Sequence, residues 1–342
     1  MSTSTAASNK KSVTDAGTPF NDPDADVILR SADNVDFRVF KVLMSLASPF
    51  FKTMFGLPQT QKEDNCDEMK DGLPVVQVTE ESKTLEMLLS MCYPMAIVDP
   101  PTLEMLEDVC VLLDAAIKYN LERVEKRVRG YLVEPRFLEI DPVRVYAIAC
   151  HYRLEAEAKL AAKATVFKPL WKRPYGAELE LITGAQLHLL LQYHDNCVDS
   201  AKNLTTDFAW IEQTSELSWF NCGYCSKELR VIGTQSRNVD TWWCNYMREF
   251  GNTLEMRNCD YTSLMDTTVA LMDKALQGAT QSCGGRVGRA REDLLMFHMI
   301  VMTKIKEVTA EVRFSHILGY TTLTIAIDRF HLISIFSDEE TG

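Results

Sequence analysis

FKVLMSLASPFFKTMF, residues 40–55, is the stretch that decides the fold. Ten of its sixteen residues are Ala, Val, Leu, Met or Phe, whereas a helix with one buried face needs only about three or four apolar positions per two turns. The Ser48-Pro49 pair divides the stretch, because serine is a favoured N-cap residue and proline a favoured first helical residue. We therefore expect two short helices that carry more apolar surface than one core face requires.

The apolar side chains of this stretch fall on two stripes, about 100° apart around a helix. The first stripe carries Val39, Leu43, Leu46, Phe50 and Met54. The second stripe carries Phe40, Met44, Phe51 and Phe55. Two interpretations stay open: both stripes are buried in one core, or one stripe serves the core and the other contacts a partner protein.

The segments around this stretch predict an α+β domain over residues 21–134. Alternating and β-branched residues predict strands at 25–31, 35–40 and 74–79. Apolar residues at helical spacing predict helices at 81–94, 102–120 and 121–133. The expected fold class is a short sheet flanked by helices, followed by a mainly α-helical C-terminal region.

The totals of the chain favour an acidic intracellular protein of two domains. It has 342 residues and a net charge of −12, so neutralisation of nucleic-acid phosphates is disfavoured and no direct nucleic-acid partner is expected. No apolar run reaches the roughly 18 residues of a membrane span, so no membrane partner is expected either. Residues 1–20 lack the apolar core of a secretory signal. We expect them to be a disordered tail, and we expect the protein in the cytoplasm or nucleus.

Residues 135–310 are expected to be mainly helical. The segments 115–126 and 148–159 match at a constant offset of 33 residues, which predicts two similar helical hairpins. The glycine- and arginine-rich residues 278–291 predict a loop. Residues 311–342 are rich in β-branched residues. We expect them to form a C-terminal tail, and the sequence does not assign its structure.

The order of motifs over residues 26–132 resembles a BTB/POZ domain. That family has an Asp-Val strand, a Phe, a basic residue, an apolar helix and Ser-x-x-Phe-x-x-Met-Phe. The matching residues here are Asp26, Val27, Phe37, Lys41, Leu43, Ser48, Phe51, Met54 and Phe55. The remainder of the chain, with Tyr-His-x-x-Cys, a CxxC and a Trp-Trp pair, is more loosely similar to BTB proteins of mushroom-forming fungi.

The resemblance implies a module that dimerises or binds a protein partner. In dimeric members the Asp and the basic residue form a charged pocket near the interface, and Asp26 and Lys41 match that pair. Phe40 stands where the family usually has His, which removes a group that titrates near neutral pH. Residues 1–20 lack the amphipathic helix of many dimeric members, so a smaller or differently built dimer is implied. The candidate interface residues are Asp26, Phe40, Lys41, Leu43, Met44, Phe50 and Phe51.

The CxxC pair Cys222 and Cys225 is the main candidate for a metal site. Two thiolates three positions apart can hold one tetrahedral ion, which favours half of a structural zinc site. His194 and Cys197, spaced as HxxC, are the candidates that complete it. Further candidates are Cys244, Cys259 and Cys283. The competing interpretations are unrelated buried thiols and, less favoured, a redox pair, which requires a thioredoxin-like unit.

Two functions from different classes follow. The first is an interaction module, self-associating or adaptor-like, for which the family suggests assembly on a cullin scaffold of a ubiquitin ligase, or transcriptional regulation. The second is a metal-dependent factor or enzyme in the C-terminal region, with the N-terminal domain as its assembly handle. The sequence contains no GxSxG, HExxH or GxGxxG motif, so a non-enzymatic protein is expected.

Overall fold

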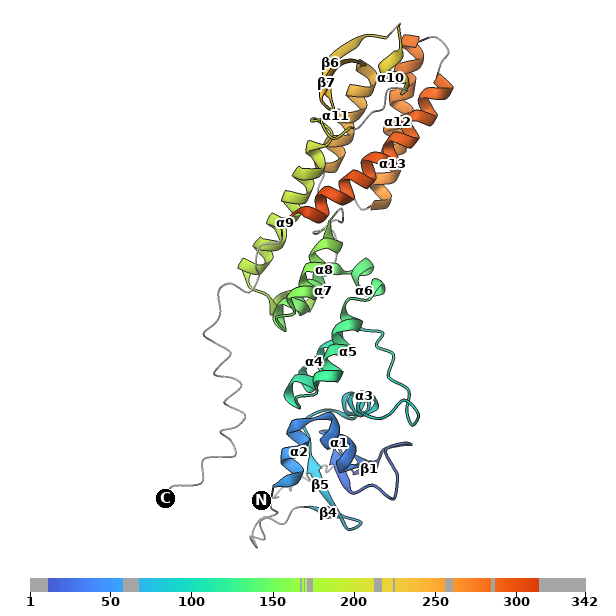
Figure 1. The fold of residues 1–342 in the computed structure, drawn as a ribbon. Coiled ribbons are helices and arrows are strands. Elements are labelled where there is room, and N and C mark those ends of the chain that lie inside the picture. The colour runs from blue at the N-terminus through green and yellow to red at the C-terminus, as the bar shows by residue number, and fades with distance from the viewer. Residues whose placement is uncertain are drawn as a thin grey trace, which may run out of the picture. The chain divides into compact units, whose positions relative to one another are not determined.

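The computed structural model of the chain consists of two compact units, Met1–Phe137 and Leu138–Gly342 (Figure 1). The boundary falls three residues after residue 134, where the sequence places the end of the first domain. The structure describes residues 12–57, 68–166, 168, 170, 175–211, 217–223, 225–255, 261–283 and 287–313. The expectations for residues 1–11 and 314–342 lie outside these residues.

A five-stranded sheet with the strand order β1-β3-β2-β5-β4 forms the base of the first unit. The strands are β1 (Thr14–Asp15), β2 (Val27–Arg30), β3 (Val35–Val39), β4 (Met69–Lys70) and β5 (Leu73–Gln77). β2 lies in the middle, antiparallel to β3 and parallel to β5. All four residues of β2 are buried, as expected for a β-branched apolar segment covered on both faces.

Helices lie between β3 and β4 and after β5 in the chain, and the predicted break at Ser48-Pro49 is confirmed. The helices are α1 (Lys41–Ala47), α2 (Pro49–Gly56), α3 (Ser82–Cys92), α4 (Leu106–Lys118) and α5 (Glu122–Leu132). α3 contacts α1, α4 and α5. The predicted fold class, a short sheet flanked by helices, is confirmed for this unit. A further short helix, α6 (Pro135–Ile140), spans the boundary between the units.

Residues 12–20 differ from the disordered tail that the sequence predicts. β1 pairs in parallel with β3 at the edge of the sheet. Phe20 is buried, with its ring centroid 5.8 Å from that of Phe37 and 5.3 Å from that of Tyr93. A two-residue strand and a single aromatic anchor hold this segment, and neither leaves a periodic signal in the sequence.

The second unit is built mainly from helices, as predicted. They are α7 (Pro142–His151), α8 (Glu155–Thr165), the 3-10 helix η1 (Ala177–Leu181), α9 (Gly184–Asn203), α10 (Ser218–Asn221), α11 (Thr241–Glu255), α12 (Tyr261–Cys283) and α13 (Val287–Glu311). Thr183 and Gln186 form a capping box at the start of α9. The core contains stacked and edge-on contacts among Trp219, Trp243 and Phe297.

A hairpin of two strands, β6 (Lys227–Ile232) and β7 (Gln235–Asp240), interrupts this helical unit. Residues 228–231 of its first strand alternate charged and apolar side chains. The alternation is misleading there, because Leu229 and Val231 are exposed. Gly233 in the connecting turn has a φ of 59°, a left-handed conformation that glycine adopts at low cost.

The loop predicted at residues 278–291 is wrong for its described part. α12 continues to Cys283, and α13 already begins at Val287. Arg289 and Arg291 therefore lie on a helix rather than in a glycine-rich loop. Gly278 lies inside α12 and Gly288 inside α13, because tertiary packing of long helices overrides the low helix propensity of glycine.

The predicted helical hairpins are confirmed as α4–α5 and α7–α8, and their turns share one backbone conformation. Leu121 N donates to Ala116 O, and Leu154 N donates to Ala149 O, both at 2.8 Å. The turn residue before each leucine has a positive φ.

Among all described helices, none combines the length and the hydrophobicity that crossing a bilayer requires.

Candidate functional site

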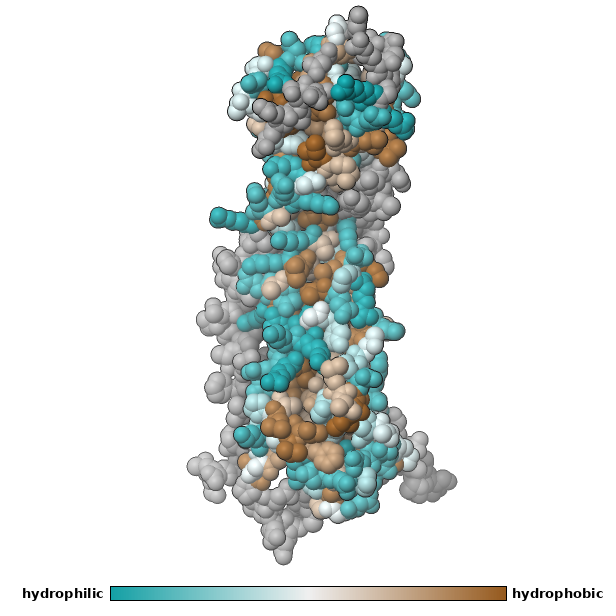
Figure 2. All heavy atoms as spheres, turned by 45° about the vertical axis from the view of Figure 1, so that its right-hand side comes forward, coloured by the Kyte–Doolittle hydropathy of each residue, from teal (hydrophilic) through white to brown (hydrophobic). Residues whose placement is uncertain are grey.

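The outer surface of α1 is the first candidate site, because this helix is apolar on both faces. Met44 is fully buried, whereas Val42 and Leu46 are 61% and 80% exposed. Residues four apart share a helix face, so Val42 and Leu46 form one strip, which we call the α1 strip. Figure 2 shows hydrophobic side chains gathered on the first unit, at the height of α1 and α3 in Figure 1. Exposed apolar surface of this kind is typical of partner sites.

Some of the predicted apolar interface residues are buried in the structure, and others are exposed. Met44 and Phe51 lie in the core of their own chain, so the prediction that they contact a partner is corrected. Phe50 is exposed, and Phe40 and Leu43 are partly buried. The stripes fail as a guide because the chain changes direction twice, at the end of β3 and at the break between α1 and α2. A single helical rotation therefore does not describe this stretch.

α2 is fixed to the core through its first residues. Ser48 Oγ accepts a hydrogen bond from Phe51 N at 3.1 Å and donates one to Tyr119 O at 2.5 Å. The Phe51 ring stacks on the Tyr119 ring with centroids 5.0 Å apart, and the Phe50 ring lies 5.5 Å from Tyr119. The predicted N-cap role of Ser48 is thus confirmed. One side of the Phe50 ring packs against Tyr119 in the core, and the rest of the ring is exposed. We therefore place Phe50 at the border between the core and the exposed surface.

Asp26 and Lys41 lie together, but not as a pair of charged side chains. Asp26 Oδ1 accepts a hydrogen bond from the backbone N of Lys41 at 2.6 Å, while Lys41 Nζ lies 5.9 Å from the centroid of the Phe55 ring. Among the described residues no ion pair joins Asp26 and Lys41, and the charged pocket at an interface stays a prediction. The physical reason for the position of Asp26 is the cap of α1: its N-cap residue is Phe40, which makes no side-chain cap hydrogen bond. Asp26 therefore satisfies an amide at the positive end of the helix.

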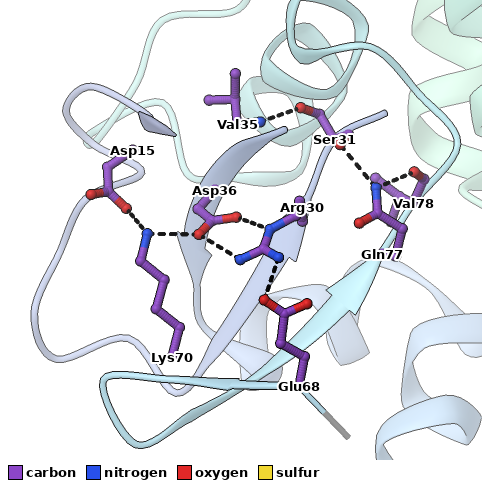
Figure 3. Close-up of polar contacts among 9 residues, drawn as sticks. All are labelled: Asp15, Arg30, Ser31, Val35, Asp36, Glu68, Lys70, Gln77 and Val78. Carbon is purple, nitrogen blue, oxygen red and sulfur yellow. Dashed lines mark hydrogen bonds and ion pairs between the residues drawn. The ribbon is translucent and has the colours of Figure 1, made fainter. Parts of the chain in front are cut away.

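A polar network that the sequence analysis does not predict joins β1, β2, β3 and the start of β4 (Figure 3). Arg30 holds both carboxylate oxygens of Asp36, with Nε at 2.6 Å and Nη2 at 3.1 Å, and its Nη1 binds Glu68 at 2.5 Å. Lys70 Nζ bridges Asp36 Oδ2 at 2.7 Å and Asp15 Oδ1 at 2.6 Å. The network thereby attaches the edge strand β1 to the centre of the sheet.

In this network, Asp36 and each of its partners Arg30 and Lys70 shift each other's pKa so that their charged forms are favoured. Burial alone raises the pKa of Asp36, but hydrogen bonds from Arg30 and Lys70 outweigh it and lower that pKa. The hydrogen bond to Asp36 raises the pKa of Arg30, and the bonds to Asp15 and Asp36 raise the pKa of Lys70. Both oxygens of Asp36 are engaged by cations, so the network is suited to holding strands together rather than to binding a ligand.

A signal for the network exists in the sequence. Arg30 and Asp36 face each other in the β2–β3 register, and Arg30 is the one charged residue of β2. Opposite charges at facing positions of a predicted hairpin point to a cross-strand pair. Lys70 and Asp15 carry no such signal, because their strands have only two residues each.

The structure brings the CxxC pair to a third residue. Single ligand atoms of Cys222, Cys225 and Asp240 all lie within 4.8 Å of one another, and the two Sγ atoms are 3.5 Å apart. Cys222 follows α10, Cys225 precedes β6, and Asp240 is the last residue of β7. Cys225 is disulfide-bonded in this structure. The CxxC spacing indicates the two cysteines but not Asp240, which reaches them only through the pairing of β6 with β7.

His194 and Cys197 do not complete this cluster, which corrects the ligand set expected from the sequence. Both are buried on α9, and Cys197 Sγ lies 3.9 Å from Thr309 O on α13. Burial raises the pKa of Cys197, as expected for an inert core thiol. The HxxC spacing therefore reflects one buried face of a helix. Of the further candidates, Cys244 is buried on α11, and the side chains of Cys259 and Cys283 lie outside the described residues.

Comparison with known proteins gives a family match within the first unit. Residues 20–135 match the family model of the BTB/POZ domain, and no curated protein matches the chain. The match begins at the buried Phe20 and ends two residues before the last residue of the first unit. It covers the sheet from β2 onward, α1 to α5 and the α1 strip. The first unit therefore carries a protein–protein interaction domain.

Proposed function

We propose that this protein self-associates through its BTB/POZ domain, with the α1 strip at the contact between two copies, and that the dimer serves as a docking platform. The observation that carries the proposal is the exposure of Val42 and Leu46 on a helix that buries Met44 on its other side. The matched domain type supports it, because BTB/POZ domains mediate protein partnering and homodimerisation.

The charge distribution favours a second copy as the occupant of this surface. The chain has a net charge of −12, yet residues 40–57 contain two lysines and no acidic residue. Two acidic copies repel each other over most of their surface. A two-fold contact places the same patch on itself, so self-association costs least where acidic side chains are missing.

The cellular role of such a dimer belongs to the same proposal. Assembly of a ubiquitin ligase on a cullin scaffold and transcriptional regulation are the two roles that we attach to it. They differ in the partner that the dimer binds. A titration of the full chain with a purified cullin distinguishes them, because only the first role requires that complex.

The test is the mass of the full chain in solution. We expect a dimer by sedimentation velocity at tens of micromolar, and a monomer for the double variant Val42→Glu and Leu46→Glu, because it places four carboxylates in each two-fold contact. The matched control is Val111→Glu, an exposed valine on α4 of the same unit, which should remain dimeric. Circular dichroism spectra of all variants should equal that of the wild type.

Two results contradict the proposal. A wild-type chain that sediments as a monomer removes self-association. A double variant that dimerises like the wild type moves the contact away from the α1 strip, as does a Val111→Glu variant that loses dimerisation equally.

A further inference from the structure

The open end of the β6–β7 hairpin concentrates groups that bind metals. Lys227 faces Asp240 in the hairpin register. Thr241 closes this end, because its backbone N and its Oγ1 both donate to Ser226 O, at 2.9 and 3.0 Å. Cys225 immediately precedes this closure, so the hairpin fixes the backbone positions of Cys225 and Asp240 relative to each other.

Asp240 is a buried carboxylate whose two oxygens have different partners. Its exposed fraction is 1%, and Oδ2 accepts a hydrogen bond from Trp242 Nε1 at 3.2 Å. Among the described residues Oδ1 has no hydrogen bond, and its nearest charged contact is Lys227 Nζ at 3.3 Å. Burial raises the pKa of Asp240. Oδ1 has the ammonium of Lys227 at 3.3 Å as its partner, and a metal ion at Oδ1 would add a second, closer cation to a carboxylate that is costly to bury in its charged form.

We propose that the reduced protein binds one zinc ion through Cys222 Sγ, Cys225 Sγ and Asp240 Oδ1, with a water molecule in the remaining tetrahedral position. Thiolates select zinc over magnesium and calcium. Two sulfurs bound to one zinc at about 2.3 Å each are separated by roughly 3.8 Å in a tetrahedral site. The observed Sγ–Sγ separation of 3.5 Å needs only a small adjustment to reach that value.

The charges of the ligands, the zinc ion and Lys227 sum to zero. Two thiolates and one carboxylate carry three negative charges, and zinc supplies two positive ones. The ammonium of Lys227, at 3.3 Å from Asp240 Oδ1, supplies the third. The site is then neutral overall, which a location at the edge of an aromatic core requires.

Zinc and the disulfide are alternative states of Cys225. Two molecules of a cellular thiol such as glutathione first reduce the disulfide of Cys225, so that their two protons pass to the two protein sulfurs and they leave joined as one small disulfide. Zinc then replaces the proton of each ligating thiol. The ion would tie the segment after α10 to the end of β7, a link inside the second unit that does not depend on the proposed dimer.

The test uses the full chain, kept reduced with a phosphine and freed of metal by dialysis against a chelator. Cobalt(II) is the probe, because cobalt bound to thiolates shows charge-transfer absorption in the near ultraviolet. We expect one equivalent of cobalt to give this band and one equivalent of zinc to abolish it. Cys222→Ser and Cys225→Ser should lose at least half of the band. Asp240→Asn should keep it, with an affinity at least about tenfold weaker.

The matched control is Cys197→Ser, which removes a buried thiol outside the cluster and should bind cobalt like the wild type. Absence of the band from the reduced wild type overturns the proposal without reference to any variant. So does an unchanged band in Cys222→Ser, or equal cobalt binding by protein in which Cys225 is oxidised. Asp240→Asn with wild-type affinity removes Asp240 from the ligand set. Circular dichroism spectra of the metal-free variants separate loss of binding from loss of fold.

Discussion

The hairpins α4–α5 and α7–α8 have the same turn but different surroundings. Each first helix ends at a tyrosine, Tyr119 or Tyr152, followed by a residue with positive φ. Tyr119 is buried, stacks on Phe51 and donates its hydroxyl proton to Glu80. Tyr152 is only partly buried and meets the exposed ring of His151 edge-on.

The difference separates two kinds of information in the sequence. The shared turn follows from local residues, since Ala, Tyr and Leu recur at equal spacing in both hairpins. The role of each tyrosine follows from what packs on it, which lies far away along the chain. For Tyr119 those neighbours come from α2 and from the segment after β5. A repeat in sequence therefore predicts equal turns but not equal energetic weight.

The largest difference is expected when the whole ring is removed. Tyr119→Ala should lower the free energy of unfolding by about 3–5 kcal/mol, because a buried aromatic ring is replaced by a cavity. Tyr152→Ala should lower it by less than about 2 kcal/mol, because this ring is partly solvated. Urea denaturation followed by circular dichroism measures both values. Equal losses would show that burial does not distinguish the two tyrosines.

A smaller difference is expected when only the hydroxyl is removed, and it should depend on pH. Burial raises the pKa of Glu80, but hydrogen bonds from Lys118 and Tyr119 outweigh it, so the pKa lies below its ordinary value of 4.5. A lowered pKa stabilises the fold above that value, and the gain is lost as the pH falls through the folded-state pKa. Tyr119→Phe should therefore cost about 1–3 kcal/mol at pH 7.

The same variant should lose less stability on acidification than the wild type, because one donor to the Glu80 carboxylate is gone. The wild type is the reference for the loss of stability between pH 6 and pH 3. Stability measured by urea denaturation across this range compares the two. A Tyr119→Phe curve parallel to that of the wild type would show that the hydroxyl does not govern Glu80.

The smallest effects are expected at the positive-φ positions, Asn120 with 51° and Arg153 with 58°. Asparagine tolerates this conformation better than arginine does, and glycine adopts it without strain. Arg153→Gly should therefore raise the free energy of unfolding by up to about 1 kcal/mol, and Asn120→Gly by less. Thermal unfolding of both variants measures the difference. A destabilised Arg153→Gly would mean that the arginine side chain contributes more than its backbone costs.

The fold of the first unit could be predicted largely from the sequence, because its signals are local. The strands at β2, β3 and β5, the Ser48 cap and the helices up to α5 all follow from alternation, periodicity and capping residues. The second unit was harder to predict. Its hairpin exposes Leu229 and Val231, and its glycine-bearing helices are held by packing rather than by propensity.

The candidate sites show the same limit. The cysteines of the CxxC pair are visible in the sequence, but Asp240 joins them only through the pairing of β6 with β7. The excess of apolar residues in 40–55 is also visible, but which of them are exposed depends on two changes of chain direction. Met44 and Leu46 are two positions apart, yet Met44 is buried and Leu46 is exposed.

The pairing of Arg30 with Asp36 has a consequence for the order in which strands can align. A hairpin shifted by two residues would keep the same side chains on the same faces of the sheet, so hydrophobicity alone hardly opposes it. In one direction the shift places Arg30 opposite Arg38, and in the other it places Asp36 opposite Ile28. Either misalignment buries charge without its counterion, at a cost of several kcal/mol. The ion pair thus selects one alignment of β2 and β3 from those that the apolar pattern allows.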